Sequence, residues 1–134
     1  MFKKLGIEQK ILHYRTDDVM LAYLYQHACA LVNPSLYEGF GLPLLEAFSC
    51  GCPVAASQAS CFPEIAGEAA LYFNPLSEDS IREVVARVIY DDDLKEKLIY
   101  KGYKRLAMFS WSKTAEETLK AYNRCLELHE TIKR

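Results

Sequence analysis

Two glutamates separated by seven residues are the side chains of this sequence best placed to do chemistry. Glu38 stands in a glycine-rich stretch, and Glu46 follows in an apolar one. Gly39 and Gly41 allow positive φ and a close approach of the backbone to a ligand. A helix expected at 44–50 would offer unpaired amides and the positive end of its dipole to a phosphate or another anion. The spacing therefore predicts an anion site bracketed by two carboxylates.

A buried strand and a short helix must position this site. The apolar run Ala30–Val32 is typical of a strand in a parallel sheet covered on both faces. Pro43 suits the first turn of a helix, where its missing N–H costs nothing. Gly51 suits the residue just past a helix end, which predicts a short helix at Leu44–Cys50.

Strands and helices alternate around this unit, which predicts an open parallel α/β sheet. The strands are expected at Lys10–Tyr14, Ala30–Val32, Pro53–Ala56 and Ala70–Phe73. The helices are expected at 19–28, at 63–65, from a cap at 77–79 to an end near 91–93, at 94–108, and after Trp111-Ser112. Gly102 is expected to interrupt or weaken the helix at 94–108. Trp111 is expected to anchor the last helix in a core, and His27 and His129 to lie on the surface.

The glycine-rich stretch resembles the donor-sugar site of retaining glycosyltransferases with two Rossmann-like domains, the GT-B architecture. The resemblance is greatest to family four, the glycosyl transferases group 1, and it covers about the whole chain. It continues, in the family's order, through Cys50–Ser57, Pro63–Gly67, Ala69–Pro75 and Phe109–Trp111. It implies an open parallel Rossmann-like sheet with flanking helices. Residues 1–134 would be one truncated domain, the distal part of the C-terminal nucleotide-sugar-binding domain, without the acceptor-binding N-terminal domain.

The resemblance also implies roles for the glycine-rich stretch. Glu38 would be the catalytic carboxylate beside the donor sugar, where its charge could favour an oxocarbenium-like transition state. Backbone amides of Gly39, Phe40, Gly41 and Leu42 would contact the sugar and the diphosphate. Without the family, the plain interpretation of Glu38 is a solvated loop carboxylate. The glycines also form a tight turn between strand and helix, which is compatible with contacts to a ligand.

Two further groups would hold the nucleotide. Glu46 would accept hydrogen bonds from both ribose hydroxyls, since a carboxylate offers two acceptor oxygens. The alternative is that Glu46 has no ligand and is simply an acidic residue that the helix dipole favours in the first turn. The base would lie near His13, Tyr14 and Arg15, at the end of the strand expected there. His13 stands where many relatives have glycine, so the base stays open, and Arg15 either reaches a phosphate or is solvated.

Cofactor chemistry is expected to be absent. The resemblance implies a class that uses amides and cations in place of a metal, and the arginine and lysine pair that binds the diphosphate in the family would precede this chain. The five cysteines are an odd number without zinc-finger spacing, and three of them lie in apolar contexts, so they read as structural thiols. A metal-independent reaction is expected, with a UDP-linked sugar as the first choice of donor.

Composition limits the partners. The net charge is −2, which gives no reason to expect nucleic acid. No apolar run approaches the length of a membrane span, and the first residues do not form a signal peptide. A cytoplasmic location is expected, with peripheral association of the full enzyme with the inner membrane. The acceptor, a glycan or a lipid-linked molecule of cell-envelope polysaccharide such as O-antigen, would be met through the missing domain.

Two other functions are compatible with part of the pattern. A dinucleotide-binding module would need a third glycine where Leu44 stands, and an acid at the end of the next strand where Ser57 stands. A non-catalytic domain that binds a nucleotide or a partner chain stays open, because a surface uncovered by truncation would favour self-association.

Overall fold

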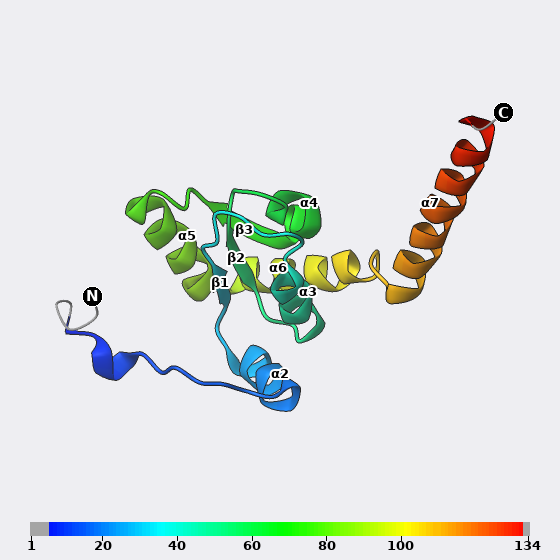
Figure 1. Cartoon of the computed structure of the whole chain (residues 1–134). Coiled ribbons are helices and arrows are strands. Elements are labelled where there is room, and N and C mark those ends of the chain that lie inside the picture. The colour runs from blue at the N-terminus through cyan, green and yellow to red at the C-terminus, as the bar shows by residue number, and fades with distance from the viewer. Residues whose placement is uncertain (1–5, 133–134) are drawn as a thin grey trace.

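The computed structural model describes residues 6–132, and side chains up to residue 129. Its centre is a parallel sheet of three strands in the order β1-β2-β3 (Figure 1). Strand β1 is Leu31–Asn33, β2 is Val54–Ser57 and β3 is Ala70–Phe73. Leu31 pairs with Val54, and Val54 pairs in turn with Ala70. The predicted open parallel sheet is thus confirmed.

Helices surround the sheet in the expected alternation. They are η1 Glu8–Lys10, α2 Asp18–His27, α3 Leu42–Ser49, α4 Phe62–Ala66, η2 Gly67–Ala69, α5 Glu78–Tyr90, α6 Asp92–Leu106 and α7 Trp111–Ile132. Side chains cap four of them, because an oxygen of Asp17, Ser77, Asp91 or Ser110 accepts a hydrogen bond from an amide of the first turn.

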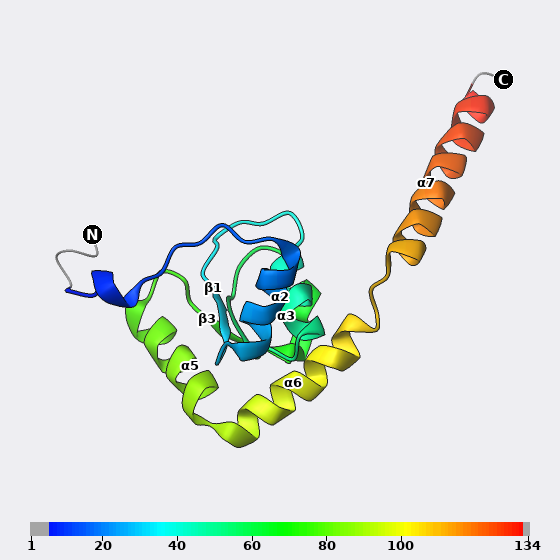
Figure 2. The same cartoon turned by 90° about the horizontal axis from the view of Figure 1, so that it is seen from below.

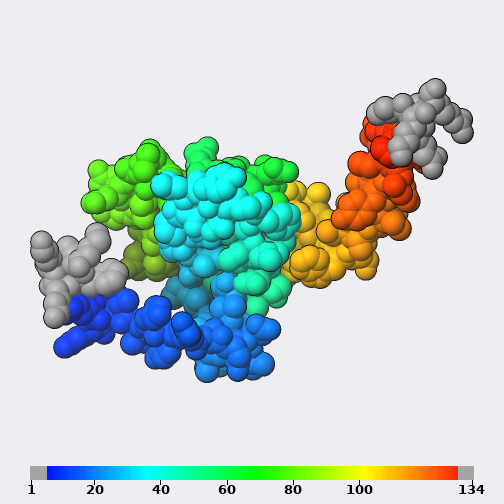
Figure 3. All heavy atoms as spheres, viewed as in Figure 1, coloured from blue at the N-terminus to red at the C-terminus, as the bar shows by residue number. Residues whose placement is uncertain are grey.

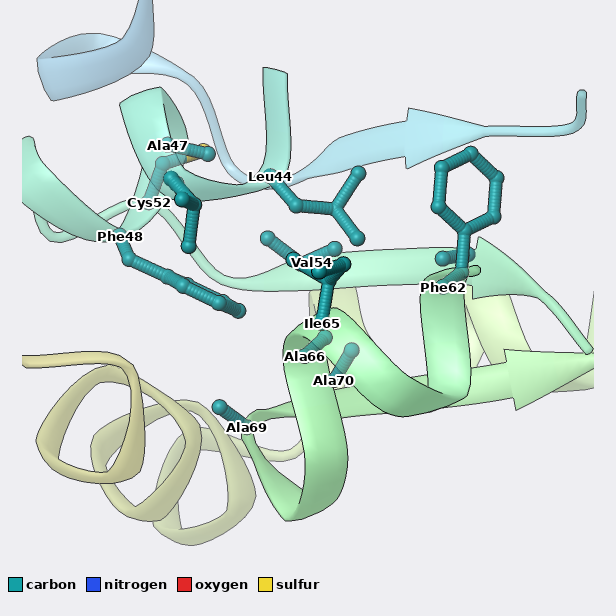
Figure 4. Close-up of a cluster of buried hydrophobic side chains, with 12 residues drawn as sticks. Leu44, Ala47, Phe48, Cys52, Val54, Phe62, Ile65, Ala66, Ala69 and Ala70 are labelled. Atoms are coloured by element: carbon teal, nitrogen blue, oxygen red, sulfur yellow. The ribbon is translucent and has the colours of Figure 1, made fainter. Parts of the chain in front are cut away.

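Side-chain alternation along β2 divides the core between the two faces of the sheet. Val54 and Ala56 belong to a cluster with side chains of α3, α4 and η2, which Figure 4 shows gathered around the strands. Ala55 belongs to a second cluster with Val84 and Val88 of α5. All four residues of β2 are buried, as a central parallel strand requires.

The strand predicted at Lys10–Tyr14 is wrong. Lys10 ends η1, and the following residues lead to α2 without pairing to the sheet (Figure 1). Leu12 is 74% exposed and Tyr14 65% exposed. A short apolar run forms a strand only where a neighbouring strand supplies hydrogen-bond partners, and β1 is not paired with this segment.

Gly102 does not interrupt α6, which is continuous from Asp92 to Leu106. It is buried against α3, and a Cβ there would lie 2.9 Å from Cδ1 of Phe48. The glycine therefore lets two helices approach closely.

The expected burial of Trp111 is also wrong. Trp111 is 78% exposed, and α7 projects away from the sheet (Figures 2 and 3). Every described side chain of α7 is exposed, so the tryptophan is not buried in a core. His27 and His129 are exposed, as expected.

Candidate functional site

The loop between β1 and α3 turns sharply into the helix at Gly41. Its φ is 93°, in the left-handed region that favours glycine. A Cβ at Gly41 would lie 3.0 Å from two ring carbons of the buried Phe62, so close packing also requires glycine. Gly39 is different: it does not have positive φ, and a Cβ there would meet nothing within 4 Å. Only one of the two glycines is therefore needed for backbone geometry.

Helix α3 begins two residues earlier than the sequence predicts and includes Pro43 in its first turn. Gly51 follows its end with φ 68°, as expected for the residue that terminates a helix. No side chain caps the helix start, where the backbone of Gly41 leads directly into it. The expected strand–loop–helix unit is therefore present.

The loop between β2 and α4 fixes the backbone of Glu38. The Glu38 amide donates to Ser60 Oγ at 3.1 Å, and the same hydroxyl donates to the Glu38 carbonyl at 2.9 Å. The buried Ser57 hydroxyl donates to the carbonyl of Ser35 in the same loop. The sequence reasoning above missed Ser60, although loops that follow neighbouring parallel strands meet at one edge of the sheet.

Glu46 lies on the exposed side of α3. Its Oε2 accepts a hydrogen bond from the Tyr25 hydroxyl of α2 at 3.3 Å. Burial, reinforced by this carboxylate, raises the pKa of Tyr25 from 10.0 to about 12. Tyr25 therefore stays a neutral donor to Glu46 across the physiological range of pH.

A cavity of about 410 Å³ opens beside Glu46. It collects three of the predicted site residues, Phe40, Leu42 and Glu46. Its other lining residues come from α3, the end of α6, the turn that follows and the start of α7: Leu45, Ser49, Leu106, Phe109, Ser110, Trp111 and Thr114. Phe40 contacts Phe109 edge-on, with ring centroids 5.9 Å apart. The participation of this distant turn could not be read from local sequence.

His13, Tyr14 and Arg15 do not line this cavity. All three are exposed, in the segment that precedes α2, and Figure 1 shows that segment below the sheet while the glycine-rich loop lies above it. Because no strand forms at Lys10–Tyr14, they do not lie at a strand end. Their assignment to the base stays a prediction.

The cysteines are unpaired and in most cases accessible. Cys52 is buried, Cys50 and Cys61 are partly buried, and Cys29 and Cys125 are exposed. Within residues 6–132, no three His, Cys, Asp or Glu side chains are grouped to hold a metal ion. No helix in the same range is both long enough and apolar enough to cross a membrane.

Known proteins are similar to this chain in sequence and in fold. Residues 1–105 match the model of the family described as glycosyl transferases group 1. The chain is 41% identical over 105 residues to the O-antigen chain mannosyltransferase B of Escherichia coli, covering 78% of this chain and 28% of that protein. It is 33% identical to the MMP alpha-(1->4)-mannosyltransferase of Mycolicibacterium hassiacum, covering 94% of this chain and 32% of that protein.

Solved structures of glycosyltransferases and related enzymes have a similar fold. Sucrose-phosphate synthase from Thermosynechococcus elongatus superposes with a TM-score of 0.83 at 26% identity, covering 95% of this chain and 33% of that one. The C-terminal domain of a glycosyl transferase group 1 family protein (LpcC) from Francisella tularensis gives 0.66 at 29% identity, covering 80% of this chain and 57% of that one. These likenesses bear out the predicted fold class, part of a GT-B glycosyltransferase.

The chain spans 28% and 32% of the lengths of the two curated relatives described above. The family match nevertheless covers more than half of the chain, and it includes β1, the glycine-rich loop, α3 and both remaining strands. The chain belongs to the glycosyl transferases group 1.

Proposed function

We propose that this chain is the donor-binding part of a retaining glycosyltransferase that transfers a hexose or N-acetylhexosamine from a nucleotide-diphosphate sugar. The observation that carries the proposal is the turn at Gly41, which joins the loop containing Glu38 to the uncapped start of α3. The unpaired backbone amides at the start of a helix can donate hydrogen bonds to a diphosphate. Glu46, one turn further on, is exposed beside the cavity that Phe40 and Leu42 also line.

In this proposal the two carboxylates act on different parts of one donor. Glu46 accepts hydrogen bonds from the vicinal ribose hydroxyls, which pair well with two carboxylate oxygens. Glu38 lies beside the sugar, accepts hydrogen bonds from its hydroxyls and stabilises positive charge that develops during transfer. Amides of Gly39, Phe40, Gly41 and Leu42 hold the sugar and the diphosphate.

The names of the relatives guide the choice of sugar and acceptor. Several relatives are called mannosyltransferases, and two of them O-antigen chain mannosyltransferases. We therefore propose a hexose donor, with mannose the first sugar to test, and a glycan or lipid-linked acceptor in cell-envelope polysaccharide synthesis. A cytoplasmic location, peripheral membrane association, metal-independent transfer and UDP as the nucleotide remain parts of the proposal.

Calorimetric titration of the chain tests this function. UDP, GDP and ADP would be titrated first, followed by the mannose, glucose and N-acetylglucosamine derivatives of the nucleotide that binds. Glu46→Ala should weaken both bare nucleotide and sugar nucleotide by about 1.5–3 kcal/mol, the cost of losing hydrogen bonds to a charged group. Glu38→Ala should weaken only the sugar nucleotide.

Glu83→Ala is the matched control, because Glu83 is an exposed glutamate on α5 and does not line the cavity. Equal effects of Glu38→Ala and Glu46→Ala on the bare nucleotide would contradict the division of roles. Absence of binding to every nucleotide would contradict a donor site formed by this chain.

One observation favours a second, compatible function in self-association. Leu119, Tyr122 and Leu126 recur at helical spacing on α7 and are 60%, 65% and 64% exposed. An apolar stripe of this kind is typical of a surface that pairs with another helix. Sedimentation velocity over a range of concentrations should detect a dimer, and Leu126→Glu should reduce it; a monomer at all concentrations would refute this function.

A further inference from the structure

Ser60 has an unusual backbone conformation in the loop between β2 and α4. Its φ is 54°, and within the described residues it is the only residue other than glycine with positive φ. Such conformations are uncommon for residues with a Cβ and persist where surrounding contacts hold them. The contacts of Ser60 therefore need an explanation.

The Ser60 hydroxyl satisfies both backbone polar groups of Glu38. It accepts from the Glu38 amide at 3.1 Å and donates to the Glu38 carbonyl at 2.9 Å. A hydroxyl can do both, since it has one donor and two acceptor lone pairs. The Cys61 thiol adds a longer contact of 3.5 Å to the same carbonyl. Two consecutive residues of one loop thus hold the backbone of a single residue in the other.

Exposed residues, Tyr37 and Gly39, flank Glu38 in the glycine-rich loop. A Cβ added at the neighbouring Gly39 would meet no heavy atom within 4 Å, and Phe40 is 42% exposed. Upstream, the loop is held by the bond from Ser57 to Ser35, and downstream by the packing of Gly41 on Phe62. Ser60 supplies the support between these two points.

We propose that Ser60 is a positioning residue, which holds the backbone of Glu38 so that its carboxylate meets the donor sugar. This inference rests on the proposed function, because it assigns Glu38 to the sugar. Ser60 itself touches no substrate. The left-handed backbone of Ser60 is the conformation in which its short side chain reaches both groups of Glu38.

Amide hydrogen exchange tests the attachment without any ligand. The Glu38 amide should exchange faster in Ser60→Ala than in the wild type, because its hydrogen-bond acceptor is gone. Ser80→Ala is the matched control, since Ser80 Oγ accepts from the Asn74 amide in the loop after β3. It should speed exchange at Asn74 and leave Glu38 unchanged. Unchanged exchange at Glu38 in Ser60→Ala would overturn the inference.

Titration with sugar nucleotide then tests the consequence. Ser60→Ala should weaken binding of the sugar nucleotide roughly 2- to 10-fold, the range expected for lost neutral hydrogen bonds, and leave the bare nucleotide unchanged. In the Glu38→Ala background the same change should have little further effect, because the carboxylate that it positions is absent. A purely structural role would weaken both ligands alike and would add to Glu38→Ala.

The outcomes separate the two proposals. If Glu38→Ala does not affect the sugar nucleotide, the assigned role of Glu38 fails, whatever Ser60 does. If Glu38→Ala weakens it and Ser60→Ala does not, the positioning role fails alone. Ser60→Gly also lacks the hydroxyl but relieves the backbone, so it should reproduce the binding pattern of Ser60→Ala even if the alanine variant folds poorly. Wild-type binding by Ser60→Gly would overturn the inference.

Discussion

Helices α3 and α7 both carry apolar side chains at helical spacing, but they differ in what lies beside them. The eight residues of α3 include four that are buried: Leu44, Leu45, Ala47 and Phe48. The much longer α7, of 22 residues, has no buried side chain among those described. Helix α3 packs between the sheet and α6, whereas α7 projects into solvent (Figure 2). An amphipathic pattern thus specifies a helix, and a second surface decides whether its apolar face is buried.

The two helices are accordingly stabilised in different ways. Local interactions support α7: Ser110 Oγ accepts from the Lys113 amide at 3.1 Å, and Lys120 pairs with Glu116 and Glu117 at 2.9 Å each. Such pairs contribute only a few tenths of a kcal/mol. Helix α3 instead draws its stability from packing between residues far apart in sequence. Changes in α3 should therefore be much more costly than changes in α7.

The largest difference is expected between Phe48→Ala and Leu119→Ala. Phe48 is 2% exposed, so its truncation should lower the free energy of unfolding by about 3–5 kcal/mol. Leu119 is 60% exposed, and its truncation should change that free energy by no more than about 0.5 kcal/mol. Urea denaturation followed by circular dichroism measures both. Similar losses for the two variants would mean that α7 buries its apolar face in solution.

The next effect concerns the turn that leads into α3. Gly41→Ala should lower the free energy of unfolding by roughly 1–3 kcal/mol, because the new Cβ would crowd the buried ring of Phe62 at a φ of 93°. Gly39→Ala is the matched control, with open space around its Cβ. Thermal unfolding compares the two variants. An equal, small effect of both changes would indicate that the ring of Phe62 yields easily.

A smaller effect on stability is expected at alkaline pH, where Tyr25 and Tyr72 lose their protons. Burial raises the pKa of Tyr72 to about 12, and its hydroxyl donates to the Gly67 carbonyl at 2.6 Å. Burial, with the Glu46 carboxylate, raises the pKa of Tyr25 to about 12 as well. The folded state thus keeps these protons when the unfolded state has lost them. The stability they confer is fully present below pH 10 and is lost as the pH rises through about 12.

Denaturation at a series of alkaline pH values measures this loss, and Tyr25→Phe and Tyr72→Phe should each reduce its steepness. Phenolate absorbance should show correspondingly late titration of two tyrosines in the wild type. Early titration of both would contradict their burial.

The smallest effect is expected from Lys120→Ala. Its two ion pairs are with exposed partners, and exposed pairs are worth about 0–1 kcal/mol. The change should reduce the helix content slightly at low salt and hardly at all at high salt, as circular dichroism can measure. A loss of helix content that does not depend on salt would indicate that the aliphatic part of the Lys120 side chain contributes by packing.

Much of the fold follows from local sequence. The strands around 30–32, 53–56 and 70–73 lie where their apolar runs predict them, within one or two residues. Ser77 caps α5, Pro43 lies in the first turn of α3, and Gly51 follows the end of α3, because each residue type suits the local backbone at its position. The unit of strand, glycine-rich loop and helix was recognisable for the same reason, because its defining residues are close together in the sequence.

Tertiary structure decided the rest. The apolar run at Lys10–Tyr14 is not paired to the sheet, Trp111 is exposed, and Gly102 leaves room for Phe48. The hydrogen bonds of Ser60 to Glu38 join residues 22 positions apart. The sequence by itself determined which segments form the three strands and most of the helices, and it placed Glu38 in the loop before α3 and Glu46 within α3. Which surfaces meet, and hence what holds Glu38 in place, depends on contacts between distant segments that no local pattern encodes.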